Sequence, residues 1–248
     1  AILSKHTNFD TYKSFEQKIA VHSALNLPQG DTLLISLPTG GGKSLVTQLL
    51  ASTSSGLTVV IVPTVALALD QYHAALNTLK EAQGIFCYRG EQSDAERMEI
   101  IKALKNRKAR ILFTSPEAIL KNQELRKVLD VNAEDRYLAN VIVDEAHVVP
   151  DWGVFFRPDF QVFSIVLKKW KRTSENHVRT YLLSATLSDD VVDALFTLFG
   201  TKGCNAQVRC DALRQEPRFY FQSVKSIKEQ VEKTMEAIRL LPKPMVVY

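Results

Sequence analysis

The chain has 248 residues, of which 46% are hydrophobic and 23% are charged. These values are typical of a globular protein that buries a sizeable core in one large domain, or in one domain plus a fragment. The net charge of +4 permits contact with nucleic acid without arguing for it. No apolar run approaches the ~20 residues of a membrane span, so we expect no membrane partner.

The three cysteines are widely spaced and include no Cys-x-x-Cys pair, which argues against a local zinc site. We expect reduced, buried thiols and a cytoplasmic (bacterial) or nuclear (eukaryotic) setting. The residues concerned are Cys87, Cys204 and Cys210.

Predicted strands alternate with predicted helices along the chain. The strands are expected at 32–36, 57–62, 84–88, 110–114, 139–143 and 179–184. The helices are expected at 13–27, 43–53, 64–80, 93–106, 116–130, from the end of a loop at 158 to Trp170, and at 189–199. Near the end of the chain an amphipathic helix is expected at 225–240 and a strand at 245–248. This alternation predicts an α/β fold, with a parallel sheet covered by helices on both faces. Functional groups then belong at the carboxyl ends of the strands.

A glycine-rich turn stands between the first strand and the next helix, in the sequence Leu37-Pro-Thr39-Gly40-Gly41-Gly42-Lys43-Ser44. Backbone N–H groups of such a turn converge at the positive end of the helix dipole, which favours phosphate. Lys43 adds a cation for the outer phosphates, and the Ser44 hydroxyl is a ligand for nucleotide-bound magnesium. Leu37 departs from the general pattern, which has glycine at this first position.

Two adjacent carboxylates, Asp144 and Glu145, follow the apolar strand 140–143 and precede Ala146 and His147. Side chains alternate along a strand, so the two carboxylates are expected to do different work. One can hold magnesium while the other polarises an attacking water. An N-cap cluster for a following helix is the structural alternative, and the glycine-rich turn upstream disfavours it.

The ordered set of motifs resembles the RecQ branch of the superfamily-2 helicases over essentially the whole chain. Residues 38–44 resemble its motif I, and Asp144-Glu-Ala-His147 with the aromatic loop to Phe160 resembles its motif II. Gln17 resembles motif 0, residues 62–71 motif Ia, 113–117 motif Ib and 183–186 motif III. Departures at Tyr12-Lys13, Val148 and Val154-Phe155 indicate a divergent member.

The resemblance implies a RecA-like P-loop NTPase fold that uses ATP and Mg²⁺ and acts on single-stranded and duplex DNA. It implies a first RecA-like domain at 1–215. Residues 216–248 would be a connecting segment and the first strand of a second RecA-like domain, the rest of which is missing. It also implies residue roles: nucleotide binding by Gln17, Thr39, Gly40, Gly41, Gly42, Lys43 and Ser44; metal binding by Ser44 and Asp144; catalysis by Lys43, Asp144, Glu145 and His147; and DNA binding or coupling by Thr64, Gln71, Trp152, Phe156, Arg157, Ser184 and Thr186.

Several readings stay open at this point. The aromatic loop around Trp152 is either a satellite core or a sensor of single-stranded DNA. The basic run 168–172 is expected to be a solvated helix end rather than a DNA patch. The function implied is a 3′-5′ DNA helicase. An ATP-driven translocase that does not unwind and a nucleotide-binding recruitment scaffold are the alternatives, and protein partners are unknown.

Overall fold

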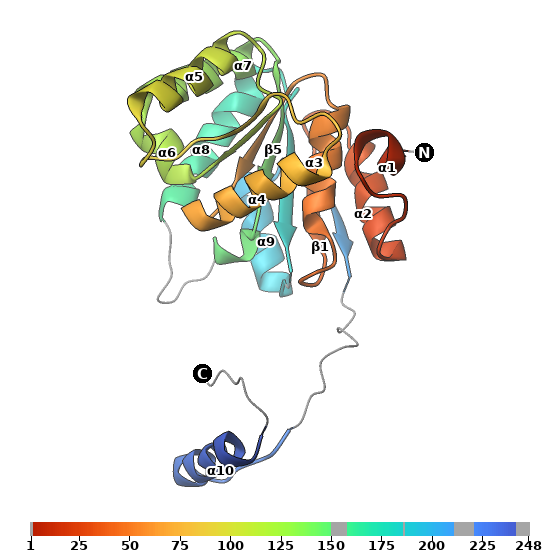
Figure 1. Ribbon diagram of the computed structural model, residues 1–248, viewed down its shortest axis with the longest axis vertical. Helices are drawn as coiled ribbons and strands as arrows, with labels where there is room; N and C mark the ends of the chain where they lie inside the picture. Colours follow the sequence, from red (N-terminus) through yellow and green to blue (C-terminus); the bar gives the residue numbers. More distant parts are fainter. Residues whose placement is uncertain (1, 150–157, 186, 211–220, 242–248) are drawn as a thin grey trace. The chain divides into compact units, whose positions relative to one another are not determined.

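The computed structural model describes residues 2–149, 158–185, 187–210 and 221–241 (Figure 1). The chain divides into two compact units, Ala1–Ala212 and Leu213–Tyr248. Within the described ranges, every helix is too short or too polar to span a bilayer.

The first unit is built on a seven-stranded sheet with the order β3-β4-β2-β5-β6-β1-β7, and every strand pair is parallel. This arrangement confirms the predicted α/β class. The strands are β1 (Thr32–Ser36), β2 (Leu57–Ile61), β3 (Ile85–Cys87), β4 (Ile111–Thr114), β5 (Leu138–Val143), β6 (Arg179–Ser184) and β7 (Asn205–Arg209).

The helices of this unit precede β1 or lie in the connections between the strands. They are α1 (Ile2–His6), α2 (Phe15–Leu25), α3 (Lys43–Thr53), α4 (Val65–Thr78), α5 (Asp94–Lys105), α6 (Pro116–Lys121), α7 (Gln123–Glu134), the 3₁₀ turn η1 (Ala146–Val148), α8 (Pro158–Thr173) and α9 (Asp189–Phe199). The single helix expected at 116–130 is two helices. Asn122 ends α6, and its side chain accepts a hydrogen bond from the N–H of Leu125 to begin α7.

Helices cover both faces of the sheet because the side chains of its strands alternate between two hydrophobic cores. Leu57, Val59 and Ile61 of β2 point into a core closed by α5 to α9, whereas Val60 points into a second core closed by α1 to α4. The strands are buried on both faces, which is why they read as continuous apolar runs in the sequence.

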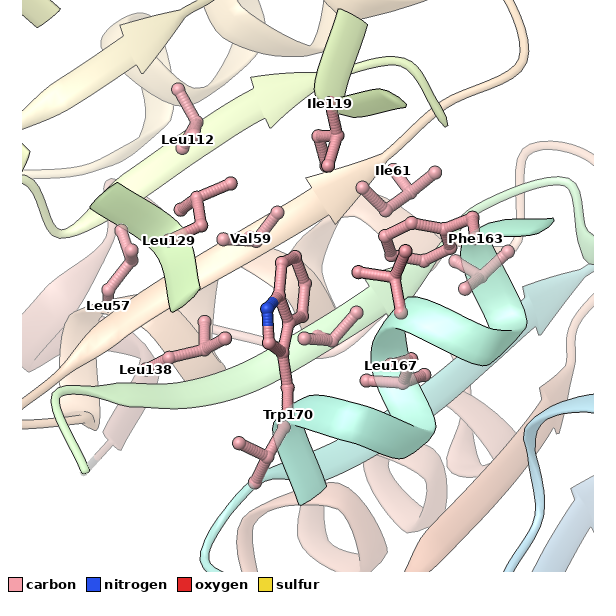
Figure 2. Close-up of a cluster of buried hydrophobic side chains, with 14 of the residues drawn as sticks. Leu57, Val59, Ile61, Leu112, Ile119, Leu129, Leu138, Phe163, Leu167 and Trp170 are labelled. Atoms are coloured by element: carbon pink, nitrogen blue, oxygen red, sulfur yellow. The ribbon is translucent and has the colours of Figure 1, made fainter. Parts of the chain in front are cut away.

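Trp170 lies at the centre of the first core, where its indole inserts between α7 and the sheet (Figure 2). Its Nε1–H donates to Asp130 of α7 at 2.6 Å. Asp130 also accepts from Arg126 and Lys169. Burial alone would raise the pKa of Asp130, but these three hydrogen bonds outweigh it and lower that pKa. The carboxylate therefore ties α8 to α7 as an ion.

The basic run 168–172 is only in part the solvated helix end that its charge predicts, because Lys168 and Arg172 are exposed but the residues between them are not. Trp170 and Lys171 are buried, and the Lys171 ammonium donates to Gly30 O at 3.1 Å and to Thr32 Oγ1 at 2.9 Å. Burial lowers the pKa of Lys171 to about 8. The Lys171 side chain therefore connects α8 to the start of β1.

Of the three thiols expected to be buried, Cys87 is buried, whereas Cys204 and Cys210 are only half-buried.

The second unit contributes one described helix, α10 (Ile227–Leu240), capped by the side chain of Ser226. The predicted amphipathic helix is confirmed there. Ile227, Val231 and Met235 recur at helical spacing and are exposed. The strand expected at 245–248 lies outside the described residues.

Replacing Asp130 with alanine should lower the free energy of unfolding by about 2–4 kcal/mol, because the buried indole N–H of Trp170 loses its acceptor and the charge of Lys169 its partner. Urea unfolding of both proteins measures the difference. Glu124→Ala is the matched control on the same helix, since Glu124 pairs with Lys105 at the surface and should cost less than about 1 kcal/mol. Equal losses in the two variants would contradict the role given to Asp130.

Candidate nucleotide-binding site

The glycine-rich turn connects β1 to α3 as predicted. Leu37 extends β1 by donating its N–H to Ser184 O of β6 at 3.1 Å. Gly40 and Gly42 then adopt left-handed conformations, with φ of 79° and 86°, which glycine reaches without steric cost. Lys43 and Ser44 open α3, where the first N–H groups of a helix have no intrahelical acceptor. The turn thus presents free backbone donors at a helix N-terminus, the arrangement that binds phosphate.

Gln17 of α2 packs against this turn. Its side chain is buried, and Nε2 donates to Gly42 O at 3.3 Å while Oε1 accepts from the N–H of Lys13 at 2.7 Å. A Cβ at residue 42 would overlap Nε2 of that amide, so the end of the Gln17 side chain would have to shift. Gln17, the motif 0 residue predicted to bind nucleotide, therefore lies beside the predicted phosphate site.

Asp144 follows β5, and its N–H donates to Ile61 O of β2 at 2.9 Å. The carboxylate is buried. Gln71 of α4 donates to Oδ2, whereas Oδ1 is buried without a hydrogen-bond partner among the described residues. Burial, and then the charge of Glu145, raise the pKa of Asp144. A buried carboxylate oxygen without a donor fits a divalent cation, because oxygen is the ligand that Mg²⁺ prefers.

Glu145 leaves the line of β5, because its backbone is left-handed with φ 49° and ψ 45°. Strand pleating was expected to separate the two carboxylates, but β5 ends at Val143, and the turn at Glu145 separates them instead. Oε1 of Glu145 lies 3.8 Å from Nζ of Lys43, and Oε2 lies 3.4 Å from Nδ1 of His147. A strained conformation in a residue other than glycine is a mark of functional sites.

His147 lies between the carboxylates and the end of β6. Its Nδ1 is 3.0 Å from Oγ of Ser184. Ser184 is the last residue of β6, which pairs with both β5 and β1. It therefore lies between the strand that precedes the carboxylates and the strand that precedes the glycine-rich turn. Thr186, the other predicted partner of His147, lies outside the described residues.

A cleft of about 430 Å³ gathers the predicted nucleotide residues, except Gly41, with Gln71, Asp144 and Glu145. It also contains residues that no sequence motif indicated, because they lie far apart along the chain and are ordinary in type. These are Phe9, Thr11, Ala74 and Thr78.

The other predicted DNA or coupling residues are placed differently. Thr64 caps α4 through the N–H of Leu67 and lines a separate cleft of about 490 Å³ with Ser115 and Glu117 of the predicted motif Ib. Both clefts open at the carboxyl ends of the strands. Trp152, Phe156 and Arg157 lie outside the described residues, so their roles stay predictions.

A phosphate-binding turn and a carboxylate pair at the carboxyl edge of a parallel sheet define a P-loop nucleotide-binding domain of RecA-like architecture. The family model described as DEAD/DEAH box helicase matches residues 15–195. The chain belongs to this family.

Named relatives agree with the RecQ resemblance. The chain is similar to "ATP-dependent DNA helicase Q-like 4B" of Arabidopsis thaliana, with 34% identity over 67% of this chain and 14% of the relative. It is also similar to "RecQ-like DNA helicase BLM" of Xenopus laevis, with 33% identity over 57% of this chain and 10% of the relative. The matches thus span about a seventh or less of these proteins.

A solved structure supports the fold alone. The crystal structure of DUF1998 helicase MrfA bound to DNA aligns with a TM-score of 0.58 and 21% identity, over 79% of this chain and 27% of that chain.

Replacing Asp144 with asparagine should raise the melting temperature of the nucleotide-free protein at neutral pH. The folded-state pKa of Asp144 is raised, so ionising it destabilises the fold as pH rises through that pKa, and the neutral amide removes this penalty. A gain of about 1 kcal/mol would appear as roughly 2–4 °C. The gain should fade in acid, where Asp144 is protonated in both states. A lower melting temperature for the variant at pH 7 would refute this account.

Proposed function

We propose that the chain is the ATP-binding motor domain of a RecQ-type, ATP-dependent DNA helicase, which couples ATP hydrolysis to 3′-5′ translocation on single-stranded DNA and to unwinding. The observation that carries the proposal is the meeting of Lys43, Asp144 and Glu145 in one cleft beside Gln17. The relatives' names, both of which print DNA helicase, support the reaction.

In this proposal the nucleotide enters with its phosphates on the turn 40–44 and its base toward Gln17. Lys43 binds the outer phosphates through its ammonium group. Ser44 and Asp144 would hold the magnesium ion, which neutralises phosphate charge when bound. The unpartnered Oδ1 of Asp144 supports this assignment.

Glu145 is proposed to orient the attacking water and accept its proton. Its carboxylate is tied only loosely, at 3.8 Å from Lys43 and 3.4 Å from His147, so it is available for another partner. His147 links this group to Ser184 at the end of β6, a route by which nucleotide state can reach motif III.

Gln71 supplies a second proposed link. It lies on α4, whose first turn carries the predicted DNA-contacting residue Thr64, and its amide holds Asp144. A shift of α4 on binding DNA would therefore act directly on the proposed metal ligand.

We also propose that residues 216–248 lead into a second RecA-like domain. The exposed apolar stripe of α10 supports this, because an amphipathic helix is stabilised mainly by packing of its apolar face.

Lys43→Ala should weaken ATP binding more than tenfold, since a charge-assisted contact to phosphate contributes about 1.5–3 kcal/mol. Isothermal titration calorimetry on residues 1–248 measures the change. Lys18→Ala, which removes an exposed lysine of α2 outside the cleft, should bind ATP as the parent does. Unchanged binding by the Lys43 variant would remove the basis of the phosphate assignment.

Glu145→Gln in the full-length protein should keep ATP binding and lose hydrolysis by at least about a hundredfold, because the amide keeps the shape and removes the basic oxygen. Steady-state ATPase assays with single-stranded DNA test this. The control is Glu134→Gln, which changes an exposed glutamate of α7. Turnover at the parental rate would assign water activation elsewhere.

A further inference from the structure

A third cleft lies at the edge of the sheet opposite the nucleotide site. Its volume is about 1220 Å³, nearly three times that of the nucleotide cleft. Ser55, Gly84, Arg110 and Tyr137 line it, and these residues directly precede or nearly precede β2, β3, β4 and β5. Because all the strands are parallel, their amino ends face away from the glycine-rich turn, and no motif of the proposed function reaches this cleft.

The lining of this amino-edge cleft is basic. The lining contains five cationic side chains and two carboxylates, those of Glu81 and Glu99. The cationic residues are Lys80, Lys102, Arg107, Lys108 and Arg110. They come from three segments: the α4–β3 connection, α5 and the α5–β4 connection. Four of the five lie within residues 102–110, a basic run in the sequence, and the fold adds Lys80 to the same lining.

Three of the five cations have partners: Lys80 donates to Ser4 O, and the two arginines form ion pairs. Arg110 pairs with Glu81 at 3.0 Å and Arg107 with Asp135 at 2.7 Å. Lys102 and Lys108 are exposed and make no ion pair within the described part of the chain. These two ammonium groups are available to an anionic partner.

Arg107 is held in an unfavourable conformation at the rim. It follows the end of α5 with φ 57°, at the position where helices usually place glycine. Its guanidinium lies 5.9 Å from the centroid of the Tyr137 ring, and Asp135 fixes it from the other side. The fold thus places a cation beside an aromatic ring in the lining of the cleft.

The interior of the cleft also offers apolar surface. Phe86 of β3 and Tyr137 are only partly buried, and Ala82 and Ala103 lie beside them. A mixed lining of this kind suits a side chain with apolar bulk flanked by acidic groups. It suits a nucleic-acid backbone less well, because evenly spaced phosphates would meet the carboxylates of Glu81 and Glu99.

We propose that the amino-edge cleft docks an acidic peptide segment of a partner protein, with an apolar side chain against Phe86 and its carboxylates on Lys102 and Lys108. This surface is distinct from the nucleotide cleft, so a partner bound there leaves the ATP site open.

Fluorescence anisotropy with a fluorescein-labelled acidic heptapeptide carrying a central phenylalanine tests the proposal on residues 1–248. Lys102→Glu with Lys108→Glu should weaken binding at least tenfold. Lys202→Glu with Lys228→Glu is the matched control, because it changes the net charge equally at exposed lysines outside the cleft and should change binding less than twofold. Replacing the phenylalanine of the probe by serine should also weaken binding.

Each other outcome overturns the proposal. Equal losses in the two double variants would mean that net charge alone attracts the probe, and no binding by the parent would mean that the cleft takes no such peptide. If the Lys102→Glu, Lys108→Glu variant instead lost binding of a fluorescently labelled oligo-dT, the cleft would be a nucleic-acid site. ATP binding and melting temperature of each variant verify folding, and the milder Lys102→Gln with Lys108→Gln replaces the charge reversal if it unfolds. A failure here leaves the ATP assignment untouched.

Discussion

The buried carboxylate of Asp144 is the constraint on which the nucleotide cleft depends. A charged group that is 5% exposed is costly unless partners surround it. The pairing of β5 with β2 sets its position, and Gln71 satisfies one of its oxygens. The other oxygen remains without a donor among the described residues. The protein therefore keeps an energetically unfavourable group at the place where a cation is proposed to bind.

The strand order explains why three distant motifs meet. In the sheet, β6 lies between β5 and β1. Asp144 follows β5, and the glycine-rich turn follows β1. The carboxyl ends of parallel strands share one edge, so Ser184 at the end of β6 lies within reach of His147. Lys43 and Glu145 approach across the same gap. The two cores hold this edge in register by burying both faces of the central strands.

Much of this arrangement is local in the sequence. The apolar runs of β1, β2, β4, β5 and β6 predict buried strands because both faces are covered, and Lys43 and Asp144 belong to short motifs whose chemistry is recognisable. What the sequence hides depends on tertiary contacts. β7 is the polar segment Asn205–Arg209, an edge strand recognisable only by its pairing with β1. In the sequence, Trp170 and Lys171 belong to a basic run that suggests a solvated helix end. The groups that accept their hydrogen bonds lie on α7 and β1, far away along the chain. Gln71 and Phe9 likewise reach the cleft only through the fold.

Amide hydrogen exchange with and without Mg·ATP tests the central claim, that one nucleotide cleft joins α2, the glycine-rich turn and the carboxylate pair. The account predicts slower exchange in three separated segments, residues 13–17, 39–45 and 144–148, with little change at the amino edge of the sheet around 80–84 and 106–110. Protection confined to one of the three segments, or protection centred on the amino edge, would contradict it.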